Sequence, residues 1–93
     1  MEIDFDPAKN AKNIRERGLS FEHVLEFDFK TAQFALDNRR DYGEVRYRAL
    51  GLIDQRLHAL VFVEITGGIR VISFRKANKR EIKQYETQSG TDR

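Results

Sequence analysis

Hydrophobic and polar residues alternate through the middle of the chain, with the period of two expected of strands that bury one face. The connections between these segments are short and Gly67-Gly68 is a strong hairpin signal, so we expect an antiparallel sheet. Ile3 and Phe5 also alternate with polar residues, which indicates a short extended lead-in. The pattern predicts four strands, over residues 31–36, 44–53, 57–65 and 69–75.

Two helices are predicted before the strands. Asp6, followed by proline, is a favourable N-cap for a helix over 8–17, and Gly18 stands where a left-handed helix end is expected. Ser20 is a favourable N-cap for a second helix that covers about 21–28.

A closing helix is expected from Asn78, because Glu81 follows three residues later in the spacing of a capping box. The predicted fold class is therefore α+β, with two N-terminal helices, a four-stranded antiparallel sheet and a C-terminal helix. Ninety-three residues indicate a single domain over 1–93, with its core at about 3–87 and a disordered tail over 88–93.

Composition narrows the class of protein. Hydrophobic residues make up 40% of the chain and charged residues of both signs 34%, which favours a folded domain over a disordered one. The absence of cysteine excludes disulfides and thiolate zinc sites, and with two histidines we expect neither a metal site nor a cofactor. No apolar run has membrane length and no signal peptide opens the chain, so we expect a cytoplasmic protein without membrane contact.

Charge is distributed unevenly between the two halves. Residues 1–44 hold seven Lys or Arg and ten Asp or Glu, whereas residues 45–93 hold ten and five. The stretch 68–83 carries six of those cations where a strand leads into a helix. Free helix N–H groups and cations attract the same anions, so this junction predicts a site for a polyanion.

The recognised phosphate-loop, metalloprotease and hydrolase motifs are absent. Basic side chains beside a sheet can instead cleave RNA without metal, through attack of the 2′-hydroxyl on the adjacent phosphate. Arginine would stabilise the phosphorane, and a Lys, Tyr, His or Glu with a tuned pKa would move the protons. The junction offers Arg75, Lys76, Lys79, Arg80 and Tyr85 for these roles.

Two further residues leave alternatives open. Arg46, on the predicted second strand, could clamp a phosphate together with Arg75, or it could form a surface pair with Glu44 or Glu64. His58 stands at a hairpin, where an exposed strand end is the favoured interpretation over a catalytic base.

Short motifs follow one another in a specific order over about residues 5–85. They are Phe5-x-x-x-Lys9 with Asn13, Gly18 and Phe21, then Tyr42-Gly43-Glu44-x-Arg46 with Gly51, then Arg70-x-Ile72-Ser73-x-Arg75-x-Ala77, Arg80-Glu81 and Tyr85. In this order and spacing the chain resembles the BrnT family, the ribonuclease half of bacterial toxin–antitoxin pairs.

The resemblance implies a RelE-like fold, metal-independent RNA cleavage that inhibits translation, and a neutralising antitoxin. The antitoxin is typically a ribbon-helix-helix DNA-binding protein, so DNA would be contacted only through that partner. An acidic antitoxin segment is expected over the basic face. The resemblance implies Arg46, Arg75, Arg80 and Tyr85 as catalytic residues and Lys9 as an RNA-binding residue. From the basic junction itself we expect Lys76 and Lys79 to bind RNA as well.

The sequence also departs from the family pattern. The family usually has Lys-His before the glycine that ends the first helix, where this chain has Glu16-Arg17-Gly18, and its Ser-Ala-Arg is here Ser73-Phe74-Arg75. The second departure is interpreted as a change in packing. The first, together with the lack of a clear general base, favours an alternative, a degenerate toxin that binds RNA or its antitoxin without catalysis. A similar fold directed at a protein target, such as a topoisomerase, is a third possibility.

Overall fold

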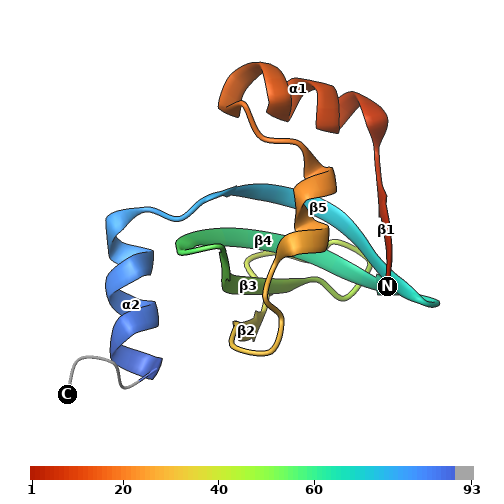
Figure 1. Ribbon diagram of the computed structural model, residues 1–93. Helices are drawn as coiled ribbons and strands as arrows, with labels where there is room; N and C mark the ends of the chain where they lie inside the picture. The colour runs from red at the N-terminus through yellow and green to blue at the C-terminus, as the bar shows by residue number, and fades with distance from the viewer. Residues whose placement is uncertain (90–93) are drawn as a thin grey trace.

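Five strands form one mixed sheet in the computed structural model, which describes residues 1–89 (Figure 1). Their spatial order is β1-β5-β4-β3-β2; β1 runs parallel to β5 and the other neighbours are antiparallel. The strands are β1 (Glu2–Phe5), β2 (Gln33–Leu36), β3 (Tyr47–Ile53), β4 (Arg56–Ile65) and β5 (Gly68–Lys76).

The expected four-stranded antiparallel sheet is wrong because of β1. Ile3 and Phe5, expected in a lead-in, pair with Ile69 and Val71. A parallel pair needs a long connection, and here everything from α1 to β4 lies between its two strands. Four alternating residues carry no signal for a partner so distant in sequence, so the strand was not predicted.

Helix α1 (Pro7–Arg17) begins and ends as predicted. The Asp6 carboxylate accepts a hydrogen bond from the backbone N–H of Ala8 at 2.9 Å. Gly18 has a φ of 64°, and its N–H donates to the carbonyl of Ile14 at 2.8 Å. Glycine adopts this left-handed conformation without strain, which stops the helix at this position.

The predicted second helix is a 3₁₀ helix, η1 (Phe21–Glu26), rather than an α-helix. Ser20 caps it as predicted and accepts from the N–H of Glu22 at 3.1 Å. The buried side chains Phe21 and Val24 of η1, and Phe27 directly after it, recur every third residue. That spacing matches the three residues per turn of a 3₁₀ helix, which presents all three to the sheet.

The C-terminal helix α2 (Lys79–Ser89) completes an α+β fold. In Figure 1, α1 lies on one side of the sheet. Helix α2 follows the C-terminal end of β5. The predicted tail over 88–93 falls largely outside the described residues, and α2 continues to Ser89. Within residues 1–89, no helix has the length and hydropathy needed to cross a membrane.

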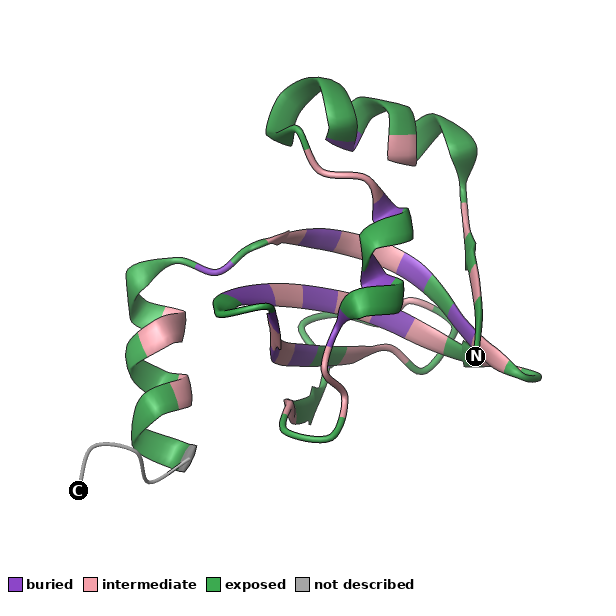
Figure 2. Cartoon of the chain, viewed as in Figure 1, coloured by how far each residue is buried: buried purple, intermediate pink, exposed green. Residues whose placement is uncertain are grey.

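The core lies between η1 and one face of the sheet. Figure 2 shows buried positions alternating with more exposed ones along β3, β4 and β5, as expected for strands with a single buried face. The buried cluster is Phe21, Val24, Phe27, Ala49, Ile53, Leu60, Phe62, Ile69, Val71 and Phe74. The opposite face of the sheet does not pack against η1 and is available for other contacts.

Helix α1 is fixed to this core by amide side chains. Nδ2 of Asn13 donates to the carbonyls of Leu19 and Phe74, both at 2.9 Å, and Asn13 is buried. Oδ1 of Asn10 accepts from the N–H of Phe21 at 2.8 Å. These bonds tie α1 to both η1 and β5, which explains why a largely polar helix keeps a defined position.

Candidate functional site

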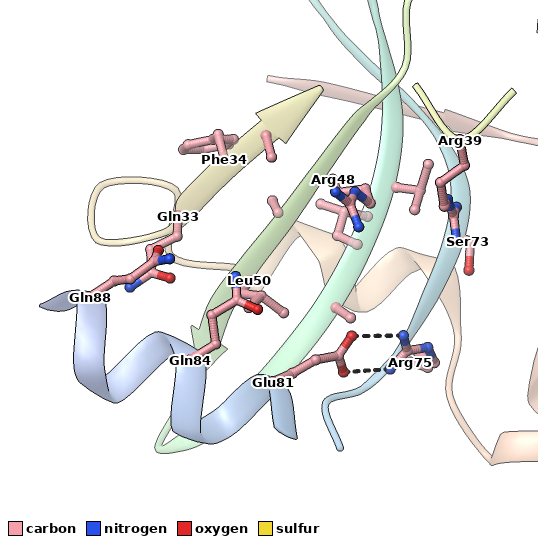
Figure 3. A pocket seen from close by; sticks show the side chains of 15 residues that line it. Gln33, Phe34, Arg39, Arg48, Leu50, Ser73, Arg75, Glu81, Gln84 and Gln88 are labelled. Carbon is pink, nitrogen blue, oxygen red and sulfur yellow. Dashed lines mark hydrogen bonds and ion pairs between the residues drawn. The ribbon is translucent and has the colours of Figure 1, made fainter. Parts of the chain in front are cut away.

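A hollow of about 420 Å³ opens on the sheet face opposite η1, between the strands and α2 (Figure 3). Leu50, Ala59 and Val61 contribute apolar surface to it. Its polar lining consists of three arginines, one glutamate, one serine and three glutamines: Arg39, Arg48, Arg75, Glu81, Ser73, Gln33, Gln84 and Gln88.

The register of the strands places these side chains together. Arg75 pairs with Ala59, which pairs with Leu50, and Leu50 pairs with Gln33, so these residues form one row across the sheet. Arg48 belongs to the adjacent row, two residues along β3 and on the same face. The two arginines therefore share one surface across the intervening strand β4.

Arg75 is held by an ion pair with Glu81. Its two terminal nitrogens donate to the two carboxylate oxygens at 2.8 and 2.9 Å. Glu81 also accepts from the N–H of Asn78 at 2.9 Å, and Asn78 Oδ1 accepts from the N–H of Glu81 at 2.9 Å. The predicted capping box is confirmed, and it fixes Glu81 at the start of α2 beside Arg75 (Figure 3).

The ion pair shifts the pKa values of both Arg75 and Glu81. Hydrogen bonds from Arg75 hold the pKa of the Glu81 carboxyl below its usual range, with Arg48 contributing a weaker attraction. The hydrogen bonds to Glu81 raise the pKa of Arg75, which the nearby positive charge of Arg39 opposes. At neutral pH the hollow therefore contains an ionised carboxylate that is paired with Arg75 and attracted by Arg48.

Arg39 reaches the hollow from the loop between β2 and β3. Its Nε and Nη2 donate to the carboxylate oxygens of Asp37 at 2.7 and 2.8 Å, and the Tyr42 hydroxyl donates to the same carboxylate at 3.3 Å. Asp37 is buried, and the hydrogen bond from Arg39 is the main cause that lowers the pKa of Asp37 to about 2. Asp37 thus orients Arg39. Arg39 is a site candidate that was not predicted from the sequence.

Arg46 does not line the hollow. Its Nε is 3.1 Å from a carboxylate oxygen of Glu44, which confirms the alternative of a local ion pair. Its guanidinium carbon lies 4.1 Å from the centre of the Tyr42 ring. Arg46 precedes the β3 row that begins at Tyr47, toward the far end of β5 from Arg75, so the two arginines form no clamp.

Tyr85 anchors α2 to the β2 edge of the sheet. Its hydroxyl donates to the carbonyl of Thr31 at 3.1 Å, and its own carbonyl accepts from Nε2 of Gln33 at 2.8 Å. The remaining predicted residues of the junction, Lys76, Lys79 and Arg80, are exposed at the end of β5 and the start of α2 and do not line the hollow.

A second, smaller hollow of about 240 Å³ lies between α1 and β5. Lys9, the remaining predicted RNA-binding residue, lines it together with Lys12 and Arg17. Ser73 lines both hollows, because β5 is an edge strand beyond its pairing with β1, where α1 contacts it through Asn13. A bound strand could pass from one hollow to the other across this edge.

His58 is buried, so its expected exposure at a strand end is wrong. Its ring stacks on Phe74 with centroids 5.3 Å apart, and its Nδ1 lies 2.9 Å from the carbonyl oxygen of Arg56. Burial is the main cause that lowers the pKa of His58. Among residues 1–89, no group of three or more His, Asp or Glu side chains is placed to hold a metal ion.

Sequence reasoning placed Arg75 correctly beside a helix start but missed several of its neighbours. Arg48 could have been found, because it shares a strand face with Arg46 at a spacing of two. Glu81 was recognised only as a helix cap. Gln33 carried no signal, because its approach to α2 depends on tertiary packing.

Fold and site together define a small α+β protein with an arginine-lined hollow suited to a phosphate group. The family model for the ribonuclease toxin BrnT of type II toxin–antitoxin systems matches residues 5–81, so the chain belongs to that family. The resemblance seen in the sequence is thereby confirmed. Membership makes the protein a ribonuclease toxin whose partner is an antitoxin. No curated protein matches the chain.

Proposed function

We propose that the protein is an endoribonuclease that binds the scissile phosphate of RNA in the arginine-lined hollow. The observation that carries this assignment is the presence of Arg39, Arg48 and Arg75 in one hollow on the sheet face (Figure 3), where Arg75 pairs with Glu81 and Arg39 is held by Asp37. Guanidinium groups bind phosphate oxygens in a bidentate manner and remain charged at all relevant pH values.

In the proposed reaction, the 2′-hydroxyl attacks the adjacent phosphorus and Glu81 accepts its proton. The arginines stabilise the charge that develops on the phosphate oxygens. The P–O5′ bond then breaks, leaving a 2′,3′-cyclic phosphate and a 5′-hydroxyl whose proton comes from water. Because the guanidinium groups supply the positive charge, the reaction needs no metal ion.

The Arg75–Glu81 pair gives this reaction a way to activate its base. A phosphate that binds Arg75 competes with Glu81 for the same N–H groups. Weaker hydrogen bonding to the carboxylate raises its pKa toward the usual value and makes it a better proton acceptor. Binding of substrate and activation of the base are thereby coupled.

The other predicted residues have supporting roles in the proposal. Lys76, Lys79 and Arg80 attract the RNA backbone at the β5–α2 junction, and Lys9 does so in the second hollow, which Ser73 connects to the first. Tyr85 positions α2 through Thr31. Arg46 positions the loop that carries Arg39, because it packs on Tyr42.

For the antitoxin, we propose a ribbon-helix-helix protein with an acidic segment that covers the hollow. Its carboxylates would replace the RNA phosphates at the arginines, and Phe34, which is 50% exposed at the rim, would add apolar contact. Neutralisation is then occlusion, and the toxin contacts operator DNA only through its partner.

A second candidate is a binding module without catalysis. The bidentate pairing of Arg75 with Glu81 favours it, because that carboxylate partly neutralises the guanidinium before any ligand arrives. The family position usually held by histidine is occupied by Arg17, whose Nη1 donates to Asn13 at 2.7 Å on the α1 side of the sheet.

Incubation of purified protein with a 5′-labelled RNA in EDTA separates the two candidates. The ribonuclease proposal predicts fragments that end in a 2′,3′-cyclic phosphate; bound but intact RNA would support the binding module. In cells, Arg75→Ala should relieve growth arrest strongly, and Arg46→Ala only as far as the Arg39 loop is disturbed. Full toxicity of Arg75→Ala would contradict the placement of the phosphate.

A further inference from the structure

One buried polar atom in the hollow lacks a hydrogen-bond partner among the described residues. It is Oε1 of Gln33, at the first position of β2. Most buried side-chain polar atoms in folded proteins are hydrogen-bonded. Oε1 is covered in this structure, and the exposed Gln88 side chain lies beside Gln33 at the rim of the hollow (Figure 3). A ligand that displaces the Gln88 side chain would be able to donate a hydrogen bond to this acceptor.

The orientation of the Gln33 amide is fixed by α2. Its Nε2 donates to the carbonyl oxygen of Tyr85 at 2.8 Å, and a carbonyl can only accept, so the nitrogen must point that way. Tyr85 is itself held, because its hydroxyl donates to the carbonyl of Thr31 at 3.1 Å. The amide cannot turn over without losing this contact, so Oε1 stays the end without a partner.

Gln33 and Arg75 stand at the two ends of one row across the sheet, with Leu50 and Ala59 between them. Three strand spacings separate their backbones by about 14 Å. Leu50 and Ala59 are half-buried and form an apolar floor between the two polar ends. A nucleotide fits this layout, with its phosphate at Arg75 and its base lying flat on the floor toward Gln33.

On the basis of the RNA-cleaving function proposed above, we propose that this floor is a nucleobase subsite in which Gln33 selects adenine. Oε1 accepts a hydrogen bond from the 6-amino group of the base. Nε2 has a second hydrogen besides the one bound by Tyr85, and it donates to N7. Glutamine and adenine form this bidentate pair in other nucleic-acid complexes, and it distinguishes adenine from a base without the amine.

Binding of uncleavable RNA tests the subsite directly. Two pentamers with 2′-fluoro groups are compared, one of adenine and one of purine, which lacks only the 6-amino group. Wild-type protein should bind the adenine pentamer about tenfold more tightly. Gln33→Leu should bind both pentamers with equal, weaker affinity, and Gln33→Glu, which keeps the acceptor, should retain part of the preference.

Tyr85→Phe is the matched control, because it removes a different bond between α2 and the β2 edge and leaves Oε1 in place. It should keep the adenine preference, even if α2 is loosened. Equal binding of the two pentamers by the wild type, or an unchanged preference in a folded Gln33→Leu protein, would overturn the subsite. Because no cleavage is measured, either result leaves the ribonuclease proposal to be judged separately.

Discussion

The three arginines of the hollow differ in what holds them. Arg75 is paired with Glu81 and Arg39 with Asp37. No hydrogen bond or ion pair joins Arg48 to the rest of residues 1–89, and its side chain is exposed. The partners of Arg39 and Arg75 keep these guanidinium groups oriented before substrate binds, whereas Arg48 can devote all its donors to a ligand.

Arg48→Ala should therefore weaken RNA binding while leaving stability nearly unchanged. We expect about a tenfold rise in the Kd for RNA, because a charged hydrogen bond is lost, and a change in unfolding free energy within about 0.5 kcal/mol. Fluorescence anisotropy and denaturant titration measure the two quantities. Arg56→Ala removes the same charge outside the hollow and should bind RNA almost normally; equal losses in both variants would contradict a specific role for Arg48.

Burial of His58 makes stability depend on pH. Because burial lowers the pKa of His58, the folded state binds its proton less readily than the unfolded chain, whose value is near 6.5. The stabilising contribution is complete above that pH and is lost as pH falls through 6.5. The unfolding free energy should decline between pH 7.5 and 5, and His58→Gln should flatten this decline. An equally steep decline in the variant would show that other titratable groups cause the pH dependence.

At the scale of elements, local chemistry was predictable and distant pairing was not. The caps at Asp6, Gly18 and Glu81 and the three long strands β3, β4 and β5 followed from short-range patterns. The register between those strands did not, and it decides that Arg48 rather than Arg46 shares the hollow with Arg75. The parallel strand β1 and the 3₁₀ form of η1 likewise depend on contacts with β5 and the sheet.

Phe27, which directly follows η1, packs closely on Gly51 of β3. A Cβ atom at Gly51 would overlap the ring of Phe27, which is buried against it. Gly51→Ala should therefore lower the unfolding free energy by about 1–3 kcal/mol through overpacking. Combining it with Phe27→Leu should cost less than the sum of the two single changes, because the smaller side chain makes room. Strict additivity would show that the two residues do not compete for space.

In the whole molecule, the two faces of the sheet have different roles. One face is packed by η1 and α1 and stabilises the fold (Figure 1). The opposite face, with α2 at its end, presents the arginines of the hollow (Figure 3). Lys9 and Lys12 extend the positive surface around the open edge of β5. The surface that we propose to bind RNA therefore wraps around one edge of the sheet, and in this proposal the antitoxin covers part of it to neutralise the toxin.

This arrangement predicts a strong dependence of RNA binding on salt. Each cation that neutralises a phosphate of single-stranded RNA contributes about −0.7 to the slope of log K against log salt. Arg48→Ala should make the slope shallower by about that amount, and Lys9→Ala should do the same from the second hollow. The slope comes from affinities measured between 50 and 300 mM KCl (roughly the range in which such slopes are linear). An unchanged slope in Lys9→Ala would show that Lys9 does not contact the RNA and that the RNA binds only in the first hollow.

In the proposed reaction, Glu81 acts as the base of a phosphate site and not only as a helix cap. The most direct measurement is the single-turnover cleavage rate of Glu81→Gln beside its affinity for uncleavable RNA. Glutamine keeps an acceptor for the capping bond at Asn78, so the helix start should survive. We expect cleavage to fall by about 10²–10⁴-fold while affinity rises, because a negative charge leaves the phosphate site. Cleavage at the wild-type rate would contradict the claim.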